Sequence, residues 1–496
     1  MIGRLNTGLW GATVKTSKSL HLSALACLAI AFAVALTASA QTVTQFDFNG
    51  KTGYEPYSTI TQGTDGNFYG TTGFGGQGNG NIFRMTPSGA ITNIHNFCQE
   101  AKCADGWGGA SPLTLGPDGN LYGVTYADTL YRLTDNGGFE TLFTFCGGVC
   151  YAPNGLTLGS DGYFYGTSNG GGISTNGNGG NGTIFKLNSS GDFTLLYSFC
   201  SLSNCTDGAY PLTPPLQGRD GNFYGTAYDG GTNGTGVVYK LTPSGQYSVL
   251  YNFGPWDNDS FADGTYPAGL VQDADGNFVG ATQNGGVHHN GVVFKITTAG
   301  KYSVLYSFGT SSAYVGWSSA ALTLASDGNF YGVLGGGPSG SWDPNVPGGL
   351  YKVTPDGAFT SLFRFCQFEG CEFNPLAPMI QATDGNLYGT AAFGGIPADY
   401  LTPDQGFGGT YQLATGLGPV VKTVPAVAAA GQSVLILGNH LTGTSSVTFN
   451  GVEAKFTVES DTYIKATVPA GATTGVVSVV TPTGTLNSNL QFVVTK

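Results

Sequence analysis

A six-residue stretch reading DGNFYG, with small variations, recurs along this chain and constrains its fold more than any single residue does. Its copies lie 43 to 59 residues apart and begin at Asp65, Asp118, Asp161, Asp220, Asp275, Asp327 and Asp384. Seven units of this size are typical of architectures built from repeated supersecondary units.

Each unit contains four short apolar runs of strand length. The first precedes the motif, as in 113–115, and the motif itself supplies the second. The third resembles 236–241, and the fourth alternates, as in 193–199. Asp-Gly and Pro-Ser-Gly turns join these runs in pairs. No sustained helical period occurs. Four antiparallel strands per unit, repeated radially, predict an all-β fold whose main body is a seven-bladed β-propeller of residues 41–415.

The ends of the repeat region predict how such a propeller closes. The last unit ends with its third run, 409–413, and lacks a fourth. An unmatched fourth run, 42–48, stands before the first unit and places Phe46 and Phe48 where Tyr251 and Phe253 stand in another unit. We expect this segment to complete the last blade, which removes two exposed sheet edges. An open solenoid is the alternative.

Residues 1–40 read as a signal peptide. Arg4, Lys15 and Lys18 supply the positive region, an apolar run covers 20–36, and Ala-Ser-Ala at 38–40 is a cleavage signal. A retained membrane anchor is the alternative, since the apolar run is near the lower limit for a span. The leader predicts an exported protein, secreted or at the cell surface, with no membrane span after cleavage.

Cysteine usage agrees with export. Outside Cys27 of the leader, the cysteines form four close pairs, each after a phenylalanine at the same point of the repeat: Cys98 and Cys103, Cys146 and Cys150, Cys200 and Cys205, Cys366 and Cys371. Local disulfides in an oxidising compartment are the expected reading. Zinc is the alternative, but every spacing exceeds two residues and no histidine accompanies the pairs.

The pattern changes after a short linker, 416–419. Residues 420–496 carry several short strands at regular spacing and predict a small β-sandwich. The pieces GNHLTGTSSVTFNG (438–451), ATVPAGATTGVVSVVTPTG (466–484) and QFVV (491–494) resemble the IPT/TIG immunoglobulin-like domain. The segment has no basic patch, so the resemblance implies the kind of TIG domain found in exported proteins, which serves as a spacer or binding accessory.

The repeats also resemble a known family. DGNFYGT at 220–226, the glycine pair 230–231 and GVVYK at 236–240 are similar to the Gloeo/Verruco tandem repeat of exported bacterial proteins. The resemblance covers about residues 57–414 and implies no particular activity. The fifth copy departs from it, because Val279 stands where the other copies have tyrosine.

Charge excludes one class of partner. The formal net charge is −12, whereas nucleic-acid binding needs a basic surface, so no nucleic-acid partner is expected. No motif for a cofactor or phosphate group appears, and no cofactor is predicted.

The long loops, which join the second strand to the third and the fourth to the next unit, are the expected binding face. They carry Trp107, Trp256, Trp317, Trp342, Tyr210 and Tyr266. Such rings suit stacking on sugars; packing between neighbouring loops is the alternative. The same loops hold Asp105, Asp207 and Asp263, each before a glycine. These aspartates are candidates for accepting sugar hydroxyls or ligating an ion, with turn formation as the alternative.

Catalysis finds little support in the sequence. The run 273–277 superficially resembles a calcium loop, but Phe278 stands where such a loop needs glycine, so no metal site is predicted. His288 and His289 share a loop, and no carboxylate partner for them is identifiable. We expect an exported, non-catalytic propeller that binds a glycan or cell-surface ligand through its long loops. The alternative is a polysaccharide hydrolase or lyase whose carboxylates converge on the central opening.

Overall fold

The computed structural model describes residues 41–495 apart from ten gaps. The gaps are 76–77, 110, 135–136, 145–149, 173–179, 255–261, 310–319, 336–347, 366–373 and 394–405. The described residues from Thr42 onward belong to one compact unit. No helix of the described residues is long and apolar enough to cross a membrane.

The described repeat region consists of four-stranded antiparallel sheets, which we number 1 to 7 by the copy of the motif they contain. The predicted all-β propeller architecture is confirmed. The strands of sheets 1 to 4 are β2 Thr61–Gln62, β3 Phe68–Thr72, β4 Asn81–Met85 and β5 Ile91–Asn96; β6 Thr114–Leu115, β7 Leu121–Val124, β8 Thr129–Leu133 and β9 Phe139–Thr144; β10 Cys150–Leu158, β11 Phe164–Gly171, β12 Thr183–Leu187 and β13 Phe193–Ser198; β14 Leu216–Gln217, β15 Phe223–Ala227, β16 Val237–Leu241 and β17 Tyr247–Asn252.

Sheets 5 to 7 repeat the plan. Their strands are β18 Thr265–Gln272, β19 Phe278–Asn284, β20 Val292–Ile296 and β21 Tyr302–Ser307; β22 Thr323–Leu324, β23 Phe330–Leu334, β24 Gly349–Val353 and β25 Phe359–Arg364; β26 Ile380–Gln381, β27 Leu387–Ala391, β28 Gly409–Leu413 and, out of chain order, β1 Val43–Asp47.

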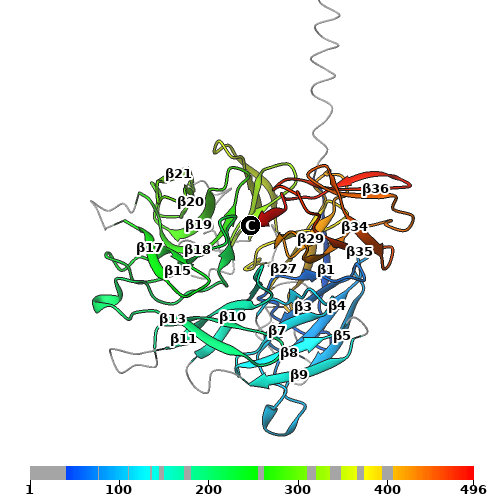
Figure 1. The fold of residues 1–496 in the computed structure, drawn as a ribbon. Coiled ribbons are helices and arrows are strands. Elements are labelled where there is room, and N and C mark those ends of the chain that lie inside the picture. Colours follow the sequence, from blue (N-terminus) through cyan, green and yellow to red (C-terminus); the bar gives the residue numbers. More distant parts are fainter. Residues whose placement is uncertain are drawn as a thin grey trace, which may run out of the picture. The chain divides into compact units, whose positions relative to one another are not determined.

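The N-terminal strand completes sheet 7, as expected. β1 pairs antiparallel with β28 from Val43 opposite Leu413 to Asp47 opposite Gly409. Figure 1 labels β1 and β27 of this sheet, and β28 lies between these two strands. Phe48, the residue after β1, is fully buried against Phe83 of sheet 1. Closure therefore joins the first and last parts of the repeat region through both hydrogen bonds and apolar packing.

Hydrogen bonds join neighbouring sheets around the innermost strands. The hydroxyls of Thr61, Thr114 and Thr323, which occupy equivalent positions, each donate to a backbone carbonyl of the next sheet, namely those of Leu113, Leu156 and Met379. Sheet 7 contacts sheet 1 in the same region, where the Thr390 hydroxyl donates to the Ser58 carbonyl at 2.9 Å and the Thr59 hydroxyl donates to the Pro378 carbonyl at 3.3 Å. The sheets consequently follow one another in a closed ring.

The motif aromatics fill the space between sheets. The motif tyrosine of one sheet packs on the motif phenylalanine of the next, with ring centroids 3.8–4.7 Å apart. The pairs are Tyr388/Phe68, Tyr122/Phe164, Tyr165/Phe223 and Tyr224/Phe278. These rings are buried, so a large part of the apolar burial that holds the ring together comes from the repeated motif itself.

The C-terminal residues form the predicted small β-sandwich. One sheet has the order β29 Lys422–Val424, β31 Ser433–Leu437, β35 Tyr463–Thr467 and β34 Lys455–Val458; the other has β33 Val452–Glu453, β32 Ser446–Phe449, β36 Val477–Thr481 and β37 Gly484–Asn487; β30 Val427–Ala429 pairs in parallel with β38 Val493–Thr495. Val421, Ile436, Phe449 and Phe492 lie in its core. Leu435 and Leu437 face the other way and join a buried cluster that contains Tyr69 of sheet 1.

Candidate ligand-binding site

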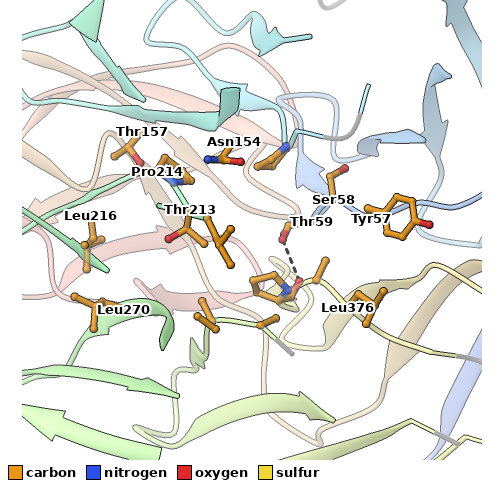
Figure 2. Close-up of a pocket in the computed structure, with 18 of the residues that line it drawn as sticks. Tyr57, Ser58, Thr59, Asn154, Thr157, Thr213, Pro214, Leu216, Leu270 and Leu376 are labelled. Carbon is orange, nitrogen blue, oxygen red and sulfur yellow. Dashed lines mark hydrogen bonds between the residues drawn. The ribbon is translucent and has the colours of Figure 1, made fainter. Parts of the chain in front are cut away.

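A cavity of about 450 Å³ occupies the centre of the ring. Its walls come from the innermost segment of every described repeat sheet, including Thr59, Pro112, Asn154, Thr213, Ala268, Ala321 and Pro378. Figure 2 shows Ser58 and Thr59 of sheet 1 across the cavity from Leu216 and Leu270 of sheets 4 and 5. The repeated first strand therefore builds the cavity, because it places the same backbone segment at the axis in each unit.

The walls carry neutral polar groups. Hydroxyls of Thr157 and Thr213 and the amides of Asn154 and Gln283 line the cavity. The Asn154 amide nitrogen donates to the Pro211 carbonyl at 2.6 Å, which orients the side chain. None of the described lining residues is acidic, basic or a histidine. The described wall residues can therefore donate and accept hydrogen bonds.

Two tyrosines stand where the cavity meets the long loops. Tyr57 precedes the first strand of sheet 1, and Tyr126 follows the second strand of sheet 2; both line the cavity. The Tyr57 hydroxyl donates to the Glu55 carboxylate at 2.7 Å. Burial, together with this bond, raises the pKa of Tyr57, so the phenol stays neutral and remains a hydrogen-bond donor.

Trp107 extends this aromatic group outward. Its ring lies edge-on to Tyr126 with centroids 6.2 Å apart, and it is 49% exposed. Gly108 allows the arrangement, because its φ is +71° and a Cβ there would lie 2.3 Å from the Tyr126 ring. We call Tyr57, Trp107 and Tyr126 the aromatic rim. Of the tryptophans predicted from the sequence, Trp256, Trp317 and Trp342 lie outside the described residues.

The other two predicted aromatics lie at the same end of sheets 4 and 5. Tyr210 is exposed, and Tyr266 stacks on Tyr228 with centroids 4.6 Å apart. Both Tyr210 and Tyr266 have left-handed φ angles, of 54° and 60°, although each precedes a proline. Bulky residues seldom adopt this conformation without a constraint from their surroundings. Here the amide of Tyr210 donates to the Asn181 carbonyl, and that of Tyr266 to the Thr235 carbonyl.

The predicted aspartates point into their own loops. The Asp105 carboxylate accepts the amides of Gln99 and Glu100 at 3.0 and 3.1 Å and lies 3.2 Å from His95 Nε2. It is fully buried, and neither it nor Asp207 lines the cavity. A carboxylate with these partners stabilises a loop and has little capacity left for a ligand. For Asp105, the arrangement corresponds to the turn-forming alternative.

The other two aspartates are held in related ways. Asp207 accepts the amide of Ser201 at 2.9 Å and the hydroxyl of Tyr197 at 2.7 Å. Asp263 accepts the Tyr251 hydroxyl at 2.5 Å. Tyr197 and Tyr251 occupy the position of His95 in their sheets, so the repeat supplies one donor to the loop aspartate in each case.

Two of the four predicted disulfides are confirmed. Cys98 is bonded to Cys103, and Cys200 to Cys205. Each bridge encloses a short 3₁₀ turn, η1 Ala101–Cys103 or η2 Ser203–Cys205, which ends two residues before the loop aspartate. The first bridge lies in the loop between sheets 1 and 2, and the second lies in the loop between sheets 3 and 4. Among the described residues no cluster of three or more potential metal ligands occurs.

The other two predicted disulfides are not confirmed. Cys371 and its expected partner Cys366 both lie outside the described residues, in the gap 366–373. Cys146 lies in the gap 145–149, and only the backbone of its expected partner Cys150 is described, as the first residue of β10. Two disulfides therefore stay predictions from the sequence, namely Cys366 with Cys371 and Cys146 with Cys150.

Sequence reasoning missed Tyr57, Tyr126 and Tyr228. Tyr57 carries a usable signal, because it directly follows the Glu-Pro pair of the first unit. That pair stands at the position that Tyr210-Pro211 and Tyr266-Pro267 occupy in other units. Tyr126 lies in the short second-to-third loop of sheet 2, and only the fold brings it next to Trp107.

Comparison with known families confirms both predicted resemblances. The model described as the Gloeobacter/Verrucomicrobia repeat matches residues 30–178 and 171–402, which together span most of the chain. The chain belongs to the Gloeobacter/Verrucomicrobia repeat family. In this member, an IPT/TIG domain follows the repeats at residues 419–494. A comparison with curated proteins finds no match.

Solved structures are similar to this family member in fold. The extracellular domain of a putative hybrid two-component system from Bacteroides thetaiotaomicron aligns with a TM-score of 0.50 at 9% identity, covering 90% of this chain and 58% of that one. A gluconolactonase from Xanthomonas campestris gives a TM-score of 0.38 at 12% identity over 77% of this chain and 93% of that one. A putative gluconolactonase gives 0.36 at 13% identity over 62% and 89%.

Proposed function

We propose that this protein is an exported, non-catalytic binding protein for a neutral glycan, which it holds at the long-loop end of the propeller. The observation that carries the proposal is the central cavity, whose hydroxyl- and amide-bearing walls meet the exposed rings of Tyr126 and Trp107. Sugar rings present apolar faces that stack on aromatics and hydroxyls that pair with such neutral groups.

The charge of the chain favours a neutral ligand over an acidic one. The formal net charge is −12, and no basic residue lines the described walls of the cavity. An acidic polysaccharide would meet a repulsive field without a compensating cation. A neutral glycan avoids that cost and uses the hydrogen-bonding groups that are present.

The alternative, a polysaccharide hydrolase or lyase at the central opening, draws no support from the cavity. Glycoside hydrolysis ordinarily requires two carboxyl groups about 5–10 Å apart beside the bond that is cleaved. No described residue that lines the central cavity carries a carboxyl group. We therefore place binding ahead of catalysis.

Export and the role of the C-terminal domain complete the proposal. The leader-like segment 1–40 and the observed disulfides support an oxidising destination, secreted or at the cell surface. In this scheme the TIG domain acts as a spacer or binding accessory, and the glycan belongs to the surroundings of the exported protein.

A glycan array tests the proposal. The secreted wild-type protein should bind one or more neutral glycans, and Trp107→Ala/Tyr126→Ala should lower the signal at least tenfold. Leu202→Ala, which removes an exposed side chain from a disulfide loop, should bind normally. A correctly folded double variant with wild-type binding would contradict the site. Release of reducing ends from any bound glycan would contradict the non-catalytic assignment.

A further inference from the structure

A second, larger cavity of about 600 Å³ lies at the opposite end of the ring. Leu216, Ala321 and Pro378 line both cavities, so the two cavities adjoin one another at the innermost strands. At this second end the walls come from the tight Asp-Gly turns of the propeller and from the C-terminal sandwich, including Lys422 and Leu490. Cavities between packed domains are frequent sites for small ligands.

Lys422 faces this cavity because of its place in β29. Neighbouring residues of a strand point to opposite faces, and Val421 lies in the sandwich core. Lys422, one residue later, points away from that core and lines the cavity. No hydrogen bond or ion pair joins its ammonium group to another described residue. Burial alone lowers the pKa of the Lys422 amine to about 8, so most of it is charged at pH 7.

The remaining charges at this end already have partners or face solvent. The Arg219 guanidinium donates to the backbone carbonyls of Ala274 and Asp273. The Asp273 carboxylate lies 2.7 Å from Lys295 Nζ and accepts two backbone amides. Asp275 is exposed. Among the described residues, Lys422 is thus a cation in a mostly apolar cavity without a paired counter-charge, which is an unfavourable state unless a ligand supplies one.

The walls around Lys422 specify the rest of such a ligand. Leu216, Val271, Leu324, Leu490 and Val493 give the cavity a predominantly apolar surface. Leu490 is among the exposed large apolar side chains of the described residues. An apolar chain would cover this surface, and burial of its methylene groups would contribute to binding.

We propose that this cavity binds an acidic amphiphile, a molecule with one carboxylate on an apolar chain. The carboxylate pairs with the Lys422 ammonium group, and the chain lies along the Leu490 wall. Binding is non-covalent, and the amine keeps its proton. The site is distinct from the glycan site, since Tyr57 and Tyr126 line only the first cavity, whereas Lys422 and Leu490 line only the second.

Calorimetric titration with decanoate tests the site, with decan-1-ol as the uncharged probe. Lys422→Met keeps the length of the side chain and removes the charge. Lys465→Met is the matched control, because Lys465 lies exposed on β35 of the same sheet. At pH 7 wild type and Lys465→Met should bind decanoate equally, and Lys422→Met at least tenfold more weakly. Decan-1-ol should bind all three alike.

The dependence on pH provides a second readout. Decanoate affinity of the wild type should fall as the pH rises from 7 to 9.5, because the amine loses its charge, while Lys422→Met should show no such fall. Trp107→Ala should bind decanoate normally, which separates this site from glycan binding. Absence of saturable decanoate binding to the wild type, or equal affinity in folded Lys422→Met, would overturn the proposal.

Discussion

The hydroxyl of Tyr69 donates a hydrogen bond of 2.9 Å to the carboxylate of Asp65, four residues earlier. The same carboxylate accepts the backbone amide of Asn67 at 3.1 Å and its side-chain amide at 2.6 Å. Equivalent tyrosine–aspartate bonds of 2.7–2.9 Å occur in all the other sheets except sheet 5. The motif is therefore a turn tied to its own strand, and its aspartate is a structural acceptor.

Removing the phenol hydroxyl from one copy should measure this bond. In Tyr224→Phe the ring keeps its contact with Phe278, at a centroid distance of 4.2 Å, but Asp220 loses a donor. We expect a loss of about 1.5–3 kcal/mol in the free energy of unfolding, as for hydrogen bonds to charged groups. Tyr224→Ala also loses the packing and should cost about 3–5 kcal/mol. Urea unfolding measures both, and wild-type stability in Tyr224→Phe would contradict the role of the hydroxyl.

Sheet 5 replaces this bond by a different one. Val279 stands at the tyrosine position, and Asp273, two residues before the motif aspartate, accepts the amides of Asp275 and Asn277 at 3.0 and 2.8 Å. Its carboxylate also pairs with Lys295. In sheet 6 the corresponding residues are Ala325 and Tyr331, and the ordinary tyrosine–aspartate bond is present.

A double variant should convert one arrangement into the other. Asp273→Ala leaves Lys295 without its buried partner and should cost about 3 kcal/mol. Asp273→Ala/Val279→Tyr recreates the sheet 6 pattern and should recover most of that loss, because Asp275 can then accept the new hydroxyl. Urea midpoints of the wild type, both single variants and the double variant give the coupling free energy. Additive losses would show that the two arrangements are not exchangeable.

The sequence predicts the architecture well because the same motif recurs in every unit of the repeat region. One period identified the strands, the turns and the missing strand 42–48, and β1 pairs with β28 as expected. Propensity and turn chemistry agree with the fold in every unit, and such agreement makes a fold predictable.

The candidate sites were harder to predict, for physical reasons. Tyr126 and Trp107 become neighbours only through the pairing of different strands. The sequence predicts that Asp105 lies in an exposed loop, yet its carboxylate points inward and accepts hydrogen bonds from loop amides. In the sequence, Lys422 is an ordinary lysine of a strand. Its place in a cavity depends on residues of both the sandwich and the propeller. Each depends on long-range packing, which a local pattern does not contain.

His95 should make the stability of the protein depend on pH. Its ring stacks on Phe139 at 3.6 Å, and burial lowers the pKa of His95 below its ordinary 6.5, although the Asp105 contact opposes this. Since the folded state disfavours the protonated ring, the unfolded state binds more protons, and stability should fall as the pH drops below about 6.5. Urea midpoints at pH 7.5 and 5.0 measure this dependence.

A tyrosine at this position should remove part of that dependence. In sheet 3 the equivalent Tyr197 donates to Asp207 at 2.7 Å and stacks on Tyr247 at 3.9 Å, so His95→Tyr retains the contacts without titrating near neutrality. The variant should lose less stability than the wild type between pH 7.5 and 5.0. His288→Gln, which changes an exposed histidine, is the control and should behave like the wild type. Identical losses in His95→Tyr and the wild type would contradict this role of His95.

Asp128 should act on stability in the opposite direction. Asp128 is buried in the loop between β7 and β8, and its φ is 56°. Its Oδ1 atom has no hydrogen-bond partner among the described residues. Burial raises the pKa of this carboxyl to about 7. Because the folded state favours the protonated acid, stability should fall as the pH rises from about 4 to 7.

Asp128→Asn removes the charge and suits the left-handed backbone. It should unfold at higher urea than the wild type at pH 8 and show little gain at pH 4, whereas Asp192→Asn, at an exposed position, should show no such difference. A gain of equal size at both pH values would mean that ionisation of Asp128 is not the cause.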